Sequence, residues 1–139
     1  MTETISLPSQ QPLAFIGGGN MASAIIGGLI QQGLPASLIE VVEPFEATRA
    51  RLKALFGIDA QADAGPRLQR AGLVVWAVKP QTFRDAAAQV RPHLGPALHL
   101  SVAAGIRSDS IAGWLGTDRI VRSMPNTPAL VGQGMTALF

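Results

Sequence analysis

Three adjacent glycines, Gly17, Gly18 and Gly19, separate two apolar patterns near the start of the chain. With Ala22 in the last place they fit the pattern G-x-G-x-x-A, which is a weak signal by itself. Glycine lacks a Cβ, so it adopts backbone angles closed to other residues and lets another molecule approach the main chain. The chemistry that this spacing permits is the binding of a phosphate by backbone N–H groups at the start of a helix. The alternative is a purely structural turn.

The segments on either side of the glycines favour the phosphate site. Residues 13–17 predict a short buried strand, and apolar residues recur at helical spacing over residues 20–32. A glycine turn between a strand and a helix is the context that a dinucleotide site requires. In such a site Gly17 permits the tight turn, Gly19 lets the backbone approach a pyrophosphate, and Ala22 lets helix pack on strand.

Strand and helix patterns continue to alternate along the chain. We expect further strands at residues 38–44, 71–78, 97–105, 119–125 and 134–139, and consider a short one at 57–60. We expect helices at residues 45–56, from Pro80 onward, and at 108–115. In the first of these helices, Leu52, Leu55 and Phe56 are expected to face inward. The alternation predicts an α/β fold, a Rossmann-like, doubly wound and mostly parallel sheet with helices on both faces.

Glu43, at the end of the second predicted strand, bears on the choice of cofactor. An acidic residue there accepts hydrogen bonds from the ribose 2′-OH of NAD, whereas NADP sites prefer small polar or basic groups. Glu43 therefore favours NADH over NADPH. Arg49 and Arg51 in the next helix could reach a 2′-phosphate, or could equally face solvent. The expected cofactor is NADPH or NADH.

Three later segments reach the carboxyl ends of predicted strands, the edge at which open α/β sheets bind ligands. These segments are residues 77–81, 101–105 and 122–128. Small residues in the second segment would leave room for a flat ring, and Lys79, Asn126 and Thr127 supply polar groups. Each segment alone could be turn chemistry. Three of them at one edge, beside a phosphate loop, favour a cofactor cleft.

Composition limits the other classes of function. The 139 residues carry a net charge of only +2, and no run of Lys or Arg suggests nucleic acid or a membrane surface. The absence of cysteine excludes disulfides and thiolate metal sites. No apolar run approaches the ~18–20 residues of a membrane span. His93 and His99 lack a partner at metal or triad spacing, so we expect no metal and no catalytic histidine, and we expect a cytoplasmic location.

Four segments, taken in order, resemble pyrroline-5-carboxylate reductase: FIGGGNMASAIIGGL, VVWAVKPQ, LSVAAGI and VRSMPNTPALVGQGMTAL. The first is shared with many dehydrogenases, whereas the combination of A-V-K-P, S-x-A-A-G and R-x-M-P-N-T-P-A is much more specific. The resemblance covers nearly the whole chain from Leu13 onward. It implies reduction of 1-pyrroline-5-carboxylate to proline, the last step of proline biosynthesis, with NADPH or NADH. It also implies a Rossmann domain joined to an all-helical second domain that dimerises.

By position, the resemblance implies three sets of cofactor contacts. The set that would hold the pyrophosphate is Ile16, Gly17, Gly18, Gly19, Asn20 and Met21. The set that would line the adenosine and nicotinamide approach is Ala77, Val78, Lys79 and Pro80. The set near the nicotinamide end is Ala103, Ala104, Gly105 and Asn126. No residue of the chain is an obvious general acid.

The chain departs from the family's pattern in three respects. Glu43 stands where some members have a small hydroxyl residue, and Ala64 where some have Asn near the cofactor ribose, which leaves the cofactor preference open. The helical second domain, expected to hold most of the substrate and to form the homo-oligomer, is not among these residues. We therefore expect residues 1–11 to be a flexible leader and residues 12–139 to be the cofactor domain of a longer reductase, with little turnover of its own.

Two other functions stay open at this point. One is a different Rossmann imine or β-hydroxyacid dehydrogenase with the same first domain. The other is a nucleotide-binding module without catalysis. Lys79, Gly105 and Asn126 favour an enzyme, because a module needs only the pyrophosphate loop.

Overall fold

The computed structural model describes residues 12–95, 97–102, 108–117 and 120–122. The expected leader, residues 1–11, and the strand expected at residues 134–139 lie outside this part of the chain. Within it, every helix is too short or too polar to cross a membrane.

Strands and helices alternate as the sequence predicts. The strands are β1 (Leu13–Ile16), β2 (Ile39–Val42), β3 (Leu73–Trp76), β4 (Leu98–Ser101) and β5 (Ile120–Arg122). The α-helices are α1 (Asn20–Gln31), α2 (Glu46–Phe56), α3 (Pro80–Val90) and α4 (Ser108–Leu115). Three short 3-10 helices, which the sequence analysis did not anticipate, are η2 (Ala36–Leu38), η3 (Pro66–Arg70) and η4 (Arg91–His93).

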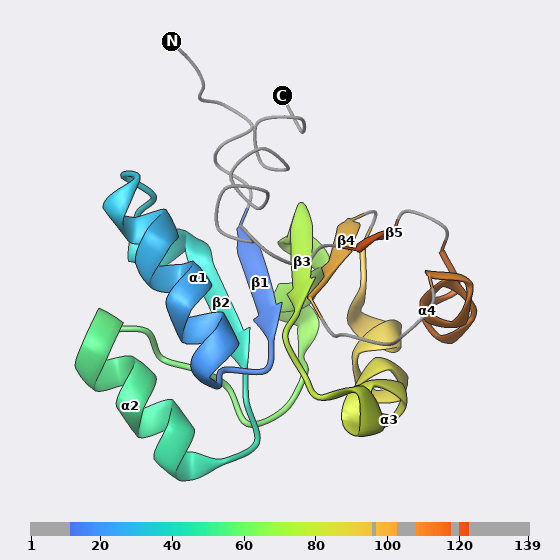
Figure 1. The fold of residues 1–139 in the computed structure, drawn as a ribbon, viewed down its shortest axis with the longest axis horizontal. Helices are drawn as coiled ribbons and strands as arrows, with labels where there is room; N and C mark the ends of the chain where they lie inside the picture. Colours follow the sequence, from blue (N-terminus) through green and yellow to red (C-terminus); the bar gives the residue numbers. More distant parts are fainter. Residues whose placement is uncertain (1–11, 96, 103–107, 118–119, 123–139) are drawn as a thin grey trace, which may run out of the picture.

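The strands form one parallel sheet in the order β2-β1-β3-β4-β5. In Figure 1, α1 and α2 lie on one side of this sheet, and α3 and α4 lie on the other. Such a connectivity, with crossover helices on both faces, is that of a doubly wound α/β fold. The predicted fold class is therefore confirmed.

The strand considered at residues 57–60 does not form. Instead one residue, Gln61, bridges Val42 from outside the sheet. The Gln61 N–H donates to the Val41 carbonyl (2.8 Å), and the Glu43 N–H donates to the Gln61 carbonyl (2.7 Å). Residues 57–60 connect α2 to this bridge, and within them Asp59 forms an ion pair with Lys53 of α2 (2.9 Å). Gln61 thus occupies the place of the third strand in the Rossmann order 3-2-1-4-5-6.

Both faces of the sheet are buried, which explains why the strands read as continuous apolar runs. On one face Phe15 packs with Ile25 of α1 and Leu52 of α2. On the other face Trp76 packs with Phe83 of α3 and Ile111 of α4. The Trp76 ring stacks on Phe83 with centroids 4.8 Å apart.

His99 belongs to this second core. It is 1% exposed, and its Nδ1 accepts a hydrogen bond from the Trp76 indole N–H (3.0 Å). A buried polar group of this kind needs a partner, and the indole supplies one. The contact gives His99 a packing role within the sheet.

The inward face of α2 is narrower than the sequence pattern predicts. Leu52 is fully buried and Phe56 is partly buried, as expected, but Leu55 is 55% exposed. Residues four apart on a helix share one stripe, and Leu55 falls on the flank of that stripe. The prediction that Leu55 faces the core is therefore wrong.

Candidate functional site

The connections that follow β1 and β3 diverge at the carboxyl ends of these two strands. The chain leaves β1 for α1 on one face of the sheet and leaves β3 for α3 on the other (Figure 1). The two strands are joined there, because the Ala77 N–H donates to the Ile16 carbonyl (2.9 Å). Doubly wound sheets bind their ligands in a crevice at such a divergence, and we expect that crevice here.

Gly17 makes the turn out of β1 in a conformation that other residues avoid. Its φ is +96°, and a Cβ built on it would lie 2.8 Å from the Ala77 carbonyl oxygen. Its N–H donates to the Val42 carbonyl of β2 (2.8 Å). Backbone angle and crowding together require glycine here, which agrees with the tight-turn role assigned to Gly17.

Gly19 is a glycine for a different reason. Its backbone is extended, with φ −75° and ψ −157°, so its φ is not in the left-handed region that favours glycine. Apart from Gly19 and its two chain neighbours, no heavy atom of the described protein lies within 4 Å of the position that a Cβ would take. Neither the backbone nor a protein neighbour demands glycine, so the remaining physical reason is close approach of a ligand. The space fits the expected pyrophosphate.

The start of α1 offers hydrogen-bond donors to that space. The backbone N–H groups of Gly19, Asn20, Met21 and Ala22 have no partner within the described residues, and the first helical bond runs from Ser23 N–H to the Gly19 carbonyl (2.9 Å). The helix has no side-chain cap and no acidic residue in its first turn. Unpaired N–H groups and the positive end of the helix dipole favour an anion at this point.

Glu43 lies beneath the glycine loop. The residue is 6% exposed, its Oε1 accepts a hydrogen bond from the Gly18 N–H (2.9 Å), and its Oε2 accepts one from the Phe45 N–H (3.0 Å). The carboxylate thus faces backbone donors of its own protein. Its expected contact with the ribose hydroxyls stays a prediction, and these partners do not support it.

Two guanidinium groups stand at the end of β2 and the start of α1. Arg49 Nη1 donates to the carbonyls of Glu43 (3.0 Å) and Pro44 (2.7 Å). Arg51 Nη1 donates to the Asn20 side-chain oxygen (2.9 Å). Within the described residues neither arginine forms an ion pair. Their positive charge is therefore available to an anionic group of a ligand.

The loop after β3 lies beside the turn at Gly17, on the other side of the expected crevice. Ala77 and Val78 are half-buried, Lys79 is exposed, and Pro80 is the first residue of α3. The Lys79 carbonyl accepts hydrogen bonds from the Thr82 N–H and hydroxyl, both at 3.0 Å. Two groups of expected residues lie outside the described part of the chain. They are the nicotinamide-end set, Ala103, Ala104, Gly105 and Asn126, and the polar residue Thr127.

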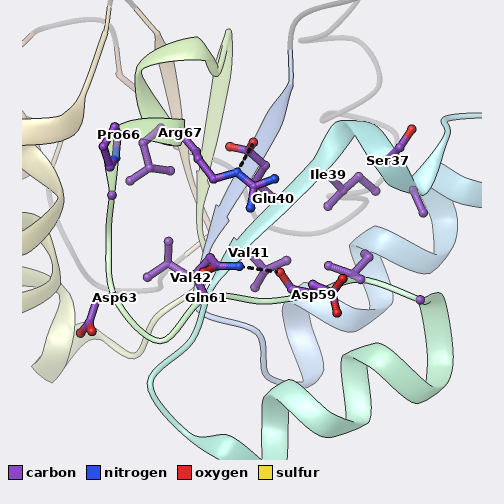
Figure 2. A pocket seen from close by; sticks show the side chains of 15 residues that line it. Ser37, Ile39, Glu40, Val41, Val42, Asp59, Gln61, Asp63, Pro66 and Arg67 are labelled. Atoms are coloured by element: carbon purple, nitrogen blue, oxygen red, sulfur yellow. Dashed lines mark hydrogen bonds and ion pairs between the residues drawn. The ribbon is translucent and has the colours of Figure 1, made fainter.

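A cavity of about 520 Å³ lies elsewhere, between the outer edge of β2 and residues 57–68. Figure 2 shows it, with Glu40 and Arg67 joined across its rim (3.6 Å). Glu40 is also paired with Arg70 (2.8 Å). No residue of the glycine loop lines this cavity. It therefore lacks the backbone N–H groups of that loop.

Fold and glycine loop together define a dinucleotide-binding domain of the Rossmann class. Residues 12–105 match the model of the family described as NADP oxidoreductase, coenzyme F420-dependent. The chain belongs to that family.

Pyrroline-5-carboxylate reductases are among the similar proteins. The chain is 43% identical over 129 residues to that of Pseudomonas aeruginosa, and 42% identical over 133 residues to that of Escherichia coli, covering 91% and 93% of this chain. The solved structure of the reductase from Coxiella burnetii aligns over 88% of this chain with a TM-score of 0.77 and 34% identity. The resemblance indicated by the motifs is thus confirmed.

These alignments cover only part of the relatives' own chains. The chain spans about half the length of the relatives that it matches: 47% of the P. aeruginosa protein, 49% of the E. coli protein and 46% of the C. burnetii chain. The similarity therefore concerns one half of those proteins.

Proposed function

We propose that this chain binds NADPH or NADH in the crevice after β1 and β3, as the cofactor half of a pyrroline-5-carboxylate reductase. The observation that carries the binding proposal is a set of N–H groups at residues 19–22 that have no partner among the described residues, beside the open position at Gly19. The assignment to pyrroline-5-carboxylate rests on relatives of that name at 42–43% identity over most of this chain.

In this proposal the chain's own residues place the cofactor. The N–H groups at the start of α1 hold the pyrophosphate, and residues 77–80 line the path from adenosine to nicotinamide. By their place in the family's motifs, the small residues 103–105 and Asn126 are assigned to the nicotinamide end. When bound, the cofactor supplies the hydride that reduces the C=N bond, while the protein supplies orientation and electrostatics.

About half of each longer relative has no counterpart in this chain. We propose that a second half, of the kind present in the longer relatives, holds the substrate and joins two copies of the protein. A cytoplasmic location also stays a prediction, which fractionation of cells expressing the whole protein would test.

Arg49 bears on cofactor preference, and we propose that it favours NADPH. Its guanidinium stands at the carboxyl end of β2, where the adenosine ribose is expected, while the carboxylate of Glu43 is turned inward. We expect Arg49→Gln to weaken NADPH binding about tenfold, because a charge-assisted contact with the 2′-phosphate is lost. NADH, which lacks that phosphate, should lose little affinity.

Calorimetric titration of the 139-residue chain with NADPH and NADH tests both parts of this proposal. Arg49→Lys retains the charge and should keep most of the preference. Arg84→Gln removes an exposed arginine from α3, on the opposite face, and should change neither affinity. Absence of binding by either cofactor would contradict the dinucleotide site. Tighter binding of NADH, unaffected by Arg49→Gln, would contradict the assigned preference.

A further inference from the structure

The carboxylate of Glu43 joins the end of β2 to the middle of the glycine loop. Its Oε1 lies 2.9 Å from the Gly18 nitrogen, across 25 residues of sequence, and its Oε2 lies 3.0 Å from the Phe45 nitrogen. A carboxylate that is 6% exposed is costly to bury unless it is hydrogen-bonded. Two charge-assisted bonds to backbone N–H groups meet that need and fix the distance between the two loops.

The glycine loop is packed tightly against the elements that Glu43 comes from. A Cβ on Gly18 would lie 2.7 Å from Leu52 Cδ1, 3.3 Å from Val41 Cγ1 and 3.4 Å from Glu43 Cβ. The loop therefore rests directly on β2 and α2. The Glu43 bond then settles the orientation of the Gly18 peptide on that surface.

This orientation decides which N–H groups remain for a ligand. The Gly18 N–H is directed to Glu43, away from the ligand space, while the next four N–H groups stay unpaired within the described residues. Binding an anion with several convergent donors requires that they be held in place beforehand. A free Gly18 peptide would let the loop sample orientations in which these donors no longer converge.

We propose that Glu43 is a positioning residue for the pyrophosphate loop, acting through Gly18, and that it supports NADPH and NADH binding to the same degree. The inference rests on the proposed dinucleotide function. It differs from the role that an acidic residue after the second strand has in NAD sites. There the carboxylate hydrogen-bonds the ribose hydroxyls and so discriminates NAD from NADP. Pyrophosphate is common to both cofactors, so a defect in the loop lowers the affinity for both.

The test compares Glu43→Ala and Glu43→Gln with the unaltered chain by calorimetry with NADPH and with NADH. Glu43→Ala should weaken both cofactors about tenfold and leave the ratio of their affinities unchanged within about twofold, because both share the pyrophosphate contacts. Glu43→Gln has the same shape and keeps one acceptor oxygen, so it should fold and recover part of the loss. Hydrogen exchange of the Gly18 amide should be fast in the alanine variant and slow in the unaltered chain.

The matched control is Glu40→Gln, which removes another largely buried carboxylate from β2. Glu40 pairs with Arg67 and Arg70, away from the glycine loop, so this variant should keep both affinities. Loss of NADH binding alone in Glu43→Ala would overturn the inference in favour of ribose recognition. Unchanged affinities in both Glu43 variants would overturn it in favour of a purely structural bond. If the unaltered chain binds neither cofactor, the proposed function fails, and the inference with it.

Discussion

Replacing Gly19 by Val is expected to lower the affinity of the chain for NADPH about a hundredfold, or ~2.7 kcal/mol, without unfolding it. The isopropyl group would occupy the open position beside the unpaired N–H groups at the start of α1. Hydrogen bonds to a charged group contribute roughly 1.5–3 kcal/mol each, so losing one or two of them accounts for the effect. The φ of Gly19 is negative, so the substitution does not force a side chain into the left-handed region. Calorimetry gives the affinity and thermal unfolding gives the stability.

Two other glycines serve as controls for this substitution. Gly65 also precedes a helix in an extended conformation with no neighbour within 4 Å, but it lies outside the glycine loop. Gly65→Val should therefore keep the affinity. Gly17→Ala should lower stability by about 1–3 kcal/mol, because φ is positive and the Ala77 carbonyl is 2.8 Å away. Unchanged affinity in Gly19→Val would show that the loop serves only the turn.

The chain by itself is expected to reduce 1-pyrroline-5-carboxylate at least a hundredfold more slowly than a full-length relative. Fast hydride transfer requires that the substrate be held within ~3–3.5 Å of the nicotinamide in the right orientation. This chain aligns with only 47% of the P. aeruginosa reductase, and we expect the rest of that protein to hold the substrate. The decisive comparison is a chimera that carries this chain in place of the matched half of that reductase. Its turnover, followed by loss of the reduced-nicotinamide absorbance, should approach that of the parent.

Two outcomes would contradict the proposal that this chain holds the cofactor while the other half of the enzyme holds the substrate. Turnover by the isolated chain comparable to the parent enzyme would place a complete substrate site within residues 1–139. A chimera that folds and binds NADPH, yet reduces a different imine or hydroxyacid in preference, would contradict the assigned substrate class. The Gly19→Val chimera is the matched control, because it should lose turnover through the cofactor alone.

The sequence was sufficient to predict the alternating elements and the glycine loop, because both depend on local patterns. Continuous apolar runs mark strands buried on both faces, and a helix that begins directly after the glycines can place N–H groups at one point. The loop geometry agrees, with Gly17 at φ +96° and an open position at Gly19. The small size of these residues and their places in the glycine motif were enough to predict this geometry.

The partners of Glu43 could not be predicted in the same way. Its position after β2 suggested an outward carboxylate, whereas the structure turns it toward Gly18, 25 residues earlier. That choice depends on how closely the loop rests on Leu52 and Val41, which is a tertiary property.

The proposed cofactor site consists of the N–H groups at the start of α1 that have no partner among the described residues. Amide NMR spectra of the 139-residue chain, recorded as NADPH is added, test it most directly. We expect the largest shift changes on the amides of Gly19, Asn20, Met21 and Ala22. The amides of Glu40 and Arg67, at the separate cavity beside β2, should change little. Largest changes at that cavity, with the glycine-loop amides unmoved, would contradict the account.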